Sequence, residues 1–383
     1  MTSVSPRIIV LREGRAGDDR QLINLAEALG QPYEVVPFHC HIGRVLLDRT
    51  MDMVGIEGPP AGRTNWGPPW PDLVLASGGR AVSAAIRLRR ISGGRTKTVF
   101  VGRPWARLDH FDLVVTTPQY RLPEAVNVIQ NLLPLNYIPE TRLGKAQAAI
   151  APRLAHLPSP RLSVLLGGDS GSYRFDAETA ADLGQKVNAQ ARAKGGSVLV
   201  TSSPRTPAAA MDALLNQLDV PGEVYWWRPN DSANPLVGYL ATADELIVTG
   251  ESASMLAEAF RSGKPVQIAA LPRRRRTRFL ARSLSGHFAK ISRLTAPIRR
   301  WLTYNGLWVP PRDLERLHRA LEQYTSVVDS TTQARRLDAD DDLRRTVAAI
   351  GNLLAVQGAT AYKAVAQRAP EGTTRPAENK QGG

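Results

Sequence analysis

The sequence has a single cysteine, Cys40, so an intrachain disulfide and a cysteine-based zinc site are both excluded. His39 and His41 flank this cysteine, but no second group of ligand residues stands at a usable spacing, and we expect no metal there. One unpaired cysteine in a chain of this length is typical of a reducing compartment.

Long apolar runs are also missing. The apolar stretch near the N-terminus, at 8–11, is too short for a signal-peptide core. No later stretch reaches the roughly 18 uncharged apolar residues that a membrane-spanning helix needs. We therefore expect a cytoplasmic protein, either soluble or peripheral on the inner face of a membrane.

Acidic residues are outnumbered, with 35 Asp and Glu against 49 Lys and Arg, for a net charge of +14. Such a surplus favours a polyanionic partner: nucleic acid, an anionic membrane face or a phosphate-bearing substrate. We expect no nucleic acid, because the Trp226–Trp227 pair that would have to stack on bases lies in an expected buried strand.

One basic run, followed by Phe279 and Leu280, indicates contact with an anionic membrane surface, and the alternative is a solvated basic surface. It consists of Arg273, Arg274, Arg275, Arg276 and Arg278.

Strands and helices alternate along most of the chain, which predicts parallel sheets covered on both faces. Short apolar runs predict strands at 7–11, 33–37, 72–76, 98–101, 112–115 and 127–132, and again at 161–166, 197–201, 223–227, 246–248 and 266–270. The pattern restarts after a proline-rich stretch. We predict two doubly wound Rossmann-like α/β domains facing each other across a cleft. Their ranges are 1–135 for the first domain, 136–160 for a linker, 161–367 for the second domain and 368–383 for a disordered tail.

The segment 244–272 is the most informative stretch and reads as strand, loop, helix and strand. Ser252 and Ser254 stand where the loop enters the helix, and free backbone N–H groups at such a helix N-terminus bind anions. Glu258 lies one turn further, where a carboxylate can accept hydrogen bonds from a ribose diol. The alternative is an ordinary serine cap and a solvated helix glutamate.

Glycine-containing loops follow the first strand of each half. They contain Gly14 and Gly17 in the first half and Gly167 and Gly168 in the second, and neither matches a complete dinucleotide or P-loop fingerprint. Their equivalent positions favour ligand binding between the domains.

The late acidic run at 340–342 is interpreted as the start of a helix rather than as a metal site.

Several blocks of the sequence resemble one family, the Elm-type family, which is named from a plant mitochondrial-fission protein and includes bacterial chains assigned as glycosyltransferases. The blocks are GRAGDDRQ (14–21), NLAEALG (24–30), PDLVLASGGR (71–80), LLGGDSGSYRF (165–175), LVTSSPRTP (199–207), NPLVGYLATAD (234–244) and TGESASMLAEAFRSGKPV (249–266).

The segment 244–272 also resembles, more distantly, the donor half of GT-B glycosyltransferases. That resemblance implies that Ser252 and Ser254 face phosphate and Glu258 faces ribose, with a nucleotide sugar as co-substrate and no metal or other cofactor. The remaining donor-side candidates are Gly167, Gly168, Asp169, Ser170, Arg174, Ser202, Arg205 and Glu251. Arg174 and Arg205 have surface salt bridges as alternatives, and Asp169 has capping of the following turn.

The acceptor hydroxyl needs a base near the cleft, and Asp18 and Asp19 are the candidates because their loop follows the first strand. Either one is open to a helix-capping role instead. The acceptor-side candidates are Gly14, Gly17, Ser77 and Gly78. The resemblance thus implies sugar transfer to a cell-envelope or lipid-linked acceptor. Its rival is a non-catalytic adaptor that keeps the fold and recruits a protein partner, as the plant relative does in mitochondrial fission.

Overall fold

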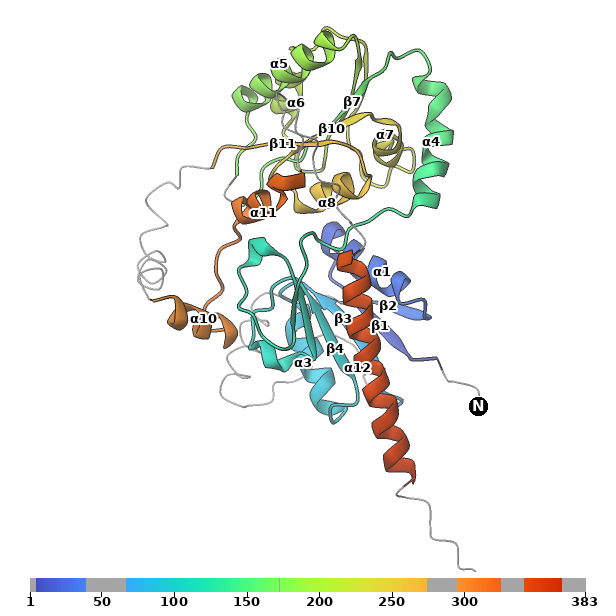
Figure 1. Cartoon of the computed structure of the whole chain (residues 1–383), viewed down its shortest axis with the longest axis vertical. Helices are drawn as coiled ribbons and strands as arrows, with labels where there is room; N and C mark the ends of the chain where they lie inside the picture. Colours follow the sequence, from blue (N-terminus) through green and yellow to red (C-terminus); the bar gives the residue numbers. More distant parts are fainter. Residues whose placement is uncertain (1–4, 39–66, 172, 274–294, 325–340, 367–383) are drawn as a thin grey trace, which may run out of the picture.

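The computed structural model describes residues 5–38, 67–171, 173–273, 295–324 and 341–366. Within these ranges the chain forms two parallel β-sheets, one in each half, with helices packed around them (Figure 1). The expected pair of Rossmann-like α/β domains is therefore confirmed. The run Arg274, Arg275, Arg276 and Arg278, the residues 39–41 and the tail 368–383 lie outside the described residues.

The N-terminal sheet has the strand order β2-β1-β3-β4-β5-β6 and is parallel throughout. Its strands are β1 (Ile8–Arg12), β2 (Tyr33–Pro37), β3 (Leu73–Ser77), β4 (Lys97–Val101), β5 (Leu113–Thr116) and β6 (Val128–Gln130). The connecting segments include α1 (Ala16–Ala28), α3 (Ala81–Ile91), η1 (Leu108–His110) and η2 (Pro118–Tyr120).

The second sheet has the order β11-β10-β7-β8-β9, again parallel. Its strands are β7 (Arg161–Leu165), β8 (Ser197–Thr201), β9 (Gly222–Tyr225), β10 (Glu245–Thr249) and β11 (Val266–Ala269). Its helices are α5 (Ala177–Ala193), α6 (Ala208–Leu215), α7 (Leu236–Thr242) and α8 (Ala253–Arg261).

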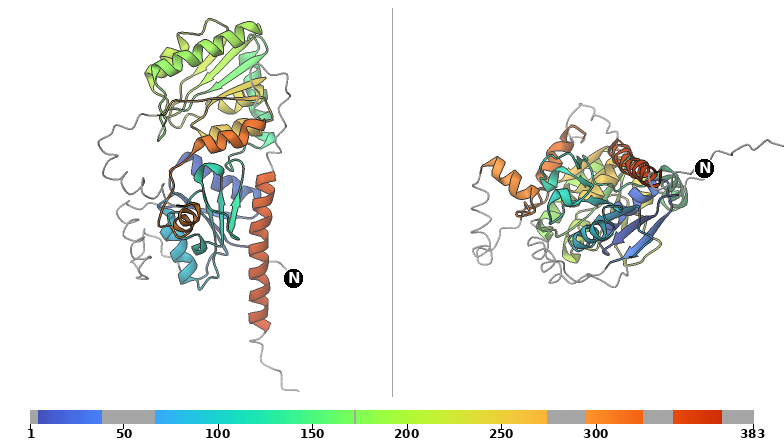
Figure 2. Two further views of the ribbon diagram at one scale, coloured as in Figure 1. Left: turned by 60° about the vertical axis from the view of Figure 1, so that its left-hand side comes forward. Right: turned by 90° about the horizontal axis from the view of Figure 1, so that it is seen from below.

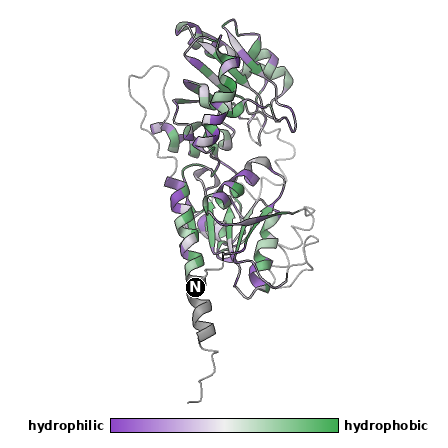
Figure 3. Cartoon of the chain, turned by 90° about the vertical axis from the view of Figure 1, so that its right-hand side faces the viewer, coloured by the Kyte–Doolittle hydropathy of each residue, from purple (hydrophilic) through white to green (hydrophobic). Residues whose placement is uncertain are grey.

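Both faces of the N-terminal sheet are buried, as the continuous apolar runs predict. Along β1, Ile9 and Leu11 pack in the core that contains the buried residues of α3, whereas Ile8 and Val10 pack in a second core with residues of α1. The strand period of two residues sends alternate side chains to opposite faces. In Figure 3 the strands are mostly coloured apolar, whereas the helices carry both apolar and polar residues.

The last helix, α12 (Asp341–Ala366), packs on the first domain rather than the second. Ile350 is fully buried in the core that contains Ile8 and Val10, and Figure 2 shows the helix running alongside the N-terminal lobe. The predicted range 161–367 for the second domain therefore does not hold for this helix. Its acidic start is confirmed, since Asp342 accepts hydrogen bonds from the backbone N–H groups of Leu132 and Leu133.

The expected linker 136–160 contains a regular helix, α4 (Glu140–Leu154). Ile150 and Leu154 pack with Leu157, Leu199 and Tyr239, so this helix belongs to the second domain. The prolines of this stretch had indicated a linker, because proline disfavours a helix interior, and one of them, Pro152, lies in the last turn of α4.

Two further helices, α10 (Ala296–Tyr304) and α11 (Leu314–Leu321), follow the second sheet. α11 lies between the lobes: Leu314 and Leu317 enter the core of the second domain, while the backbone N–H of Asp313 donates to the carbonyl of Gln119 in η2 (Figure 1).

The expectation that Trp226 and Trp227 are core is wrong, because β9 ends before them and their exposed fractions are 39% and 36%.

No helix among the described residues is long and apolar enough to cross a membrane.

The docking of α12 generates a test of the domain assignment. Replacing Ile350 by Ala leaves a cavity between α12 and the first sheet, and we expect the free energy of unfolding to fall by about 2–5 kcal/mol. Denaturant unfolding followed by circular dichroism measures this change. The matched control is Asn352→Ala, at an exposed position of the same helix, which should change stability by less than about 0.5 kcal/mol. Equal effects of the two substitutions would contradict the packing of α12.

Candidate active site

The two sheets present their carboxyl edges to each other, and the helices that follow those edges meet. Gly17 is the second residue of α1 and Ser254 is the second residue of α8. A Cβ atom on Gly17 would stand 3.6 Å from the Ser254 hydroxyl oxygen, which is van der Waals contact. The first turns of one helix from each domain therefore touch at the domain interface (Figure 1).

Neither of these helix N-termini has a side-chain cap within the described residues. The N-cap residues are Arg15 for α1 and Ser252 for α8, and neither side chain makes a capping hydrogen bond to a described backbone N–H. The first N–H groups of a helix carry partial positive charge, which an anion offsets. That Ser252 and Ser254 face phosphate stays a prediction, and the structure places the start of α1 opposite the start of α8.

Glu258 points across the domain interface, where its carboxylate pairs with the guanidinium of Arg20 from α1 at 3.4 Å. Its side chain is 8% exposed, and burial raises its pKa, although Arg20 opposes that shift. The carboxylate is not turned away from the interface, but Arg20 holds the position that a ribose diol was expected to take.

The glycine loop after β7 is held by side chains that follow β10. The N–H of Gly167 donates to the Thr249 hydroxyl and the N–H of Gly168 donates to Glu251, both at 2.7 Å. A Cβ on Gly167 would overlap the Glu251 carboxylate, and one on Gly168 would overlap the backbone of Arg205. Glycine is needed here for close approach, and these two N–H groups bond within the protein.

Glu251 is fully buried and lies between that loop and Arg205, whose guanidinium stands 3.5 Å from its carboxylate. Burial raises the pKa of Glu251, and one carboxylate oxygen, Oε2, has no hydrogen-bond partner among the described residues. Arg205 is 40% exposed, so this guanidinium is accessible to a ligand beside the N-terminus of α8.

The other donor-side candidates have local partners. Asp169 accepts from the N–H of Phe175 at 2.9 Å, which is the capping role named as its alternative. Arg174 pairs with Asp176 at 3.2 Å in a salt bridge at the surface. The Ser202 hydroxyl accepts from the N–H of Trp227, and Ser170 bonds through its backbone to Tyr173.

The two candidate bases have different environments. Asp19 is buried and accepts hydrogen bonds from the N–H groups of Glu13 and Gly14 and from Arg12, so it organises the loop after β1. Asp18 has no hydrogen bond or ion pair within 4 Å among the described residues. Burial raises its pKa, opposed by the nearby guanidinium groups of Arg15 and Arg312. Asp18 is the better placed of the two for proton transfer.

The acceptor-side glycines shape the same edge. Gly78 adopts φ +84°, and a Cβ there would overlap the carboxylate of Glu13. Glu13 accepts from the N–H of Ala81 at 2.5 Å, so it caps α3, and burial raises its pKa. The Ser77 hydroxyl donates to the carbonyl of Val101 and is part of the sheet edge. Sequence reasoning missed Glu13, although its place directly after β1 was a usable signal.

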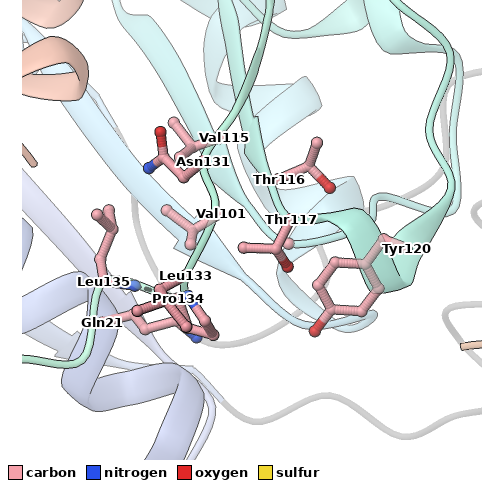
Figure 4. Close-up of a pocket in the computed structure, with 11 residues that line it drawn as sticks. Gln21, Val101, Val115, Thr116, Thr117, Tyr120, Asn131, Leu133, Pro134 and Leu135 are labelled. Carbon is pink, nitrogen blue, oxygen red and sulfur yellow. Dashed lines mark hydrogen bonds between the residues drawn. The ribbon is translucent and has the colours of Figure 1, made fainter. Parts of the chain in front are cut away.

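A small pocket lies at the carboxyl ends of β4, β5 and β6, between them and α1 (Figure 4). Its polar lining residues are Gln21, Thr116, Thr117, Tyr120 and Asn131, and Leu133 and Leu135 close one side. Arg103, from the loop after β4, lies over the Tyr120 ring with its Cζ atom 5.7 Å from the ring centroid. Sequence reasoning missed Arg103, Tyr120 and Arg312, because only the folded loops bring them together.

No group of three or more potential metal ligands is present among the described residues.

The raised pKa of Glu13 generates a prediction about pH. The folded protein keeps a proton on this carboxyl at pH values where the unfolded chain, with a pKa of about 4.3, has released it. The free energy of unfolding should therefore fall as pH rises from about 4.3 through the folded-state pKa. Glu13→Gln keeps an acceptor for the Ala81 N–H but does not titrate, so it should flatten this slope in denaturant titrations. The exposed control Glu27→Gln should leave the slope unchanged, and identical slopes for both variants would contradict the burial argument.

Among solved structures, similar chains share the general architecture at low identity. UDP-GlcNAc 2-epimerase from Neisseria meningitidis, bound to UDP-GlcNAc, is 11% identical with a TM-score of 0.40, over 82% of this chain and 97% of that one. MurG from Acinetobacter baumannii is 12% identical with a TM-score of 0.40, over 91% of this chain and 99% of that one. These likenesses are too distant to carry an argument about function.

The sequence comparisons are more specific. Mitochondrial fission protein ELM1 of Arabidopsis thaliana is 29% identical over an alignment of 220 residues, which covers 52% of this chain and 51% of that protein. Uncharacterized protein RP120 of Rickettsia prowazekii (strain Madrid E) is 25% identical over 146 residues, 37% of this chain and 41% of that protein. The matches thus span about half the length of these curated relatives or less. A model of the family described as mitochondrial fission ELM1 matches residues 16–291, so the chain belongs to that family.

Proposed function

We propose that the protein binds the diphosphate of a nucleotide sugar between its two domains and transfers the sugar to an acceptor hydroxyl without a bound metal. The observation that carries this proposal is the meeting of two helix N-termini, those of α1 and α8, without side-chain caps among the described residues. Two like helix poles that lie close together repel each other, and an anion at their junction offsets both.

The phosphate side of the proposed site is formed by α8 and Arg205. Arg205 contacts the buried Glu251 at 3.5 Å, which is long for a charge-assisted hydrogen bond and leaves N–H donors for a phosphate oxygen. Since the departing nucleoside diphosphate gains negative charge, these donors would stabilise it where a metal ion does so in other transferases.

The ribose side requires a movement. Glu258 becomes available to a diol when Arg20 leaves it, and Arg20 belongs to the other domain. We infer that the donor competes with Arg20 for this carboxylate. A small separation of the domains would break this ion pair and expose Glu258 to the donor.

Asp18 is the proposed base. Its carboxylate takes the proton of the acceptor hydroxyl while that oxygen bonds to the anomeric carbon and the bond to the nucleoside diphosphate breaks. Burial raises the pKa of Asp18, which brings a carboxyl group closer to the value suited to proton transfer near neutral pH. Asp19 is not proposed for this role, because three hydrogen bonds commit it to the loop after β1.

The same ion pair favours a second candidate, a non-catalytic adaptor. With Arg20 on Glu258 and Gly17 against Ser254, the described structure is closed at the position of the ribose. A family member that had lost donor binding would keep this closed arrangement and use its outer surface to recruit a protein partner.

Opposite effects of the two members of the ion pair test the transferase proposal. Glu258→Ala should weaken binding of the preferred donor by about tenfold or more, because it removes the ribose acceptor. Arg20→Ala should strengthen binding, because it removes the competitor. Isothermal titration of the full chain with UDP-, GDP- and ADP-sugars measures both changes.

Arg192→Gln is the control, since Arg192 pairs with Asp219 on the outer surface of the second domain. Equal losses in both ion-pair variants would mean that the pair only stabilises the interface. No heat from any donor, together with a protein partner recovered by pull-down, would support the adaptor.

We also propose that the protein works at an anionic membrane surface on the inner face of the cell, where a lipid-linked or envelope acceptor is available. Arg273 itself pairs with Glu315 at 2.8 Å. The support therefore comes from α10 and the residues after it, where Ile298, Trp301 and Leu307 have exposed fractions of 45%, 59% and 42% and stand beside the exposed Arg300. Exposed aromatic and aliphatic side chains next to arginine fit a membrane interface.

Vesicle sedimentation tests this surface. Trp301→Ser should lower binding to phosphatidylglycerol-containing vesicles at low salt by about tenfold, because it removes the largest exposed apolar side chain of α10. Val126→Ser is the control, since Val126 is also exposed but lies in the loop before β6. Unchanged vesicle binding by Trp301→Ser, or wild-type protein that stays in the supernatant, would refute the membrane assignment.

A further inference from the structure

Arginine side chains gather at the carboxyl edge of the N-terminal sheet, around Tyr120. Arg103 comes from the loop after β4, Arg15 precedes α1, and Arg312 comes from the segment before α11. Burial raises the pKa of Tyr120, and the positive charges of all three arginines oppose that shift. Burial lowers the pKa of Arg103, and the charge of Arg312 lowers it further. Segments separated by up to about three hundred residues of sequence thus place three guanidinium groups at one position.

These guanidinium groups lack anionic partners at contact distance. Among the described residues, none of the three forms an ion pair within 4 Å with a carboxylate. Arg103 is the clearest case: its Nη1 atom is buried and has no hydrogen-bond partner in the described part of the chain. Burial also lowers the pKa of Arg103, which marks the cost of holding its charge there without a counter-ion.

Unpartnered neutral groups lie beside them. The hydroxyl oxygens of Thr116 and Thr117 and the side-chain oxygen of Gln119 are buried and lack hydrogen-bond partners among the described residues. Thr117 and Tyr120 also line the pocket at the ends of β4 and β5, and their side chains lie close together in Figure 4. Buried polar groups are normally paired, so these oxygens are available for hydrogen bonds to a ligand.

The charge balance identifies the ligand class. Asp18 is the carboxylate that acts on Tyr120 in this cluster, so three positive charges face one negative charge. A dianion would complete the balance, and guanidinium groups match the oxygens of phosphate in paired hydrogen bonds. Threonine and tyrosine hydroxyls supply further donors to phosphate oxygens.

We propose that Arg15, Arg103, Arg312, Thr117 and Tyr120 form a second anion site, on the first domain and separate from α8, that binds the phosphate group of a second ligand. It takes a phosphate monoester, either on a soluble molecule or on a lipid headgroup. The link to catalysis rests on the proposed function: a phosphate held here would fix an acceptor with its hydroxyl near Asp18.

The test uses the full chain and two kinds of probe. Phenyl phosphate, titrated by calorimetry, represents a soluble monoester, and vesicles of phosphatidic acid in phosphatidylcholine represent the lipid source. Arg103→Gln should weaken binding of the responding probe by about tenfold or more, and Arg312→Gln should do so to a similar extent. Arg103→Lys, which keeps the charge but not the planar fork, should retain part of the affinity.

The matched control is Arg107→Gln, in the same loop as Arg103, whose guanidinium is exposed and paired with Asp109. Thermal melting of each variant shows whether it folds. If Arg103→Gln binds phenyl phosphate and the vesicles as tightly as the wild type does, the proposal of a second anion site is overturned. Titration of the same variants with the nucleotide sugars reports separately on α8, so loss of the donor site and loss of this site are distinguishable.

Discussion

The contact between the first turns of α1 and α8 is the constraint on which the rest of the interface depends. A Cβ atom at Gly17 would make ordinary contact with Ser254, so the two helix ends lie close together. The approach brings like partial charges together, which is unfavourable unless negative charge lies close by. Glu258, one turn into α8, supplies part of that charge, and Arg20 then pairs with it across the interface. In this arrangement the charges at the interface are paired within the protein, by side chains that a ligand would otherwise contact.

Buried carboxylates play the same structural role in both domains. Glu13 follows β1 and accepts from the N-terminus of α3, while Glu251 follows β10 and accepts from the glycine loop after β7. In each case a glycine, Gly78 or Gly167, leaves the space that the carboxylate fills. Each glutamate also has one oxygen without a partner among the described residues, and burial raises both pKa values. Burial thus disfavours the charged form of both residues, while their hydrogen bonds fix the two loops.

Much of the fold could be predicted from the sequence, because parallel strands buried on both faces read as short apolar runs such as 73–76 and 246–248. The sequence patterns did not place the helices α4 and α12, because their partners depend on long-range packing: Ile150 packs in one core with Tyr239, and Ile350 packs in another with residues of α1 and β4. At the candidate site, sequence patterns located α8 and Asp18. They could not show that Arg20 covers Glu258 or that Arg103 and Arg312 meet at Tyr120, because those contacts join segments that share no local motif.

The placement of α11 explains how the two lobes hold their relative position while the interface stays polar. Leu314 and Leu317 anchor this helix in the second domain, His318 bonds to the carbonyl of Gly250 at 2.7 Å, and Asp313 bonds to η2 of the first domain. One helix therefore contacts both the strand end that precedes α8 and the loop that carries Tyr120. Any change in the separation of the lobes must move α11 relative to one of these two loops. Arg312 lies two residues before this helix, so a movement of α11 would also shift one of the positive charges near Tyr120.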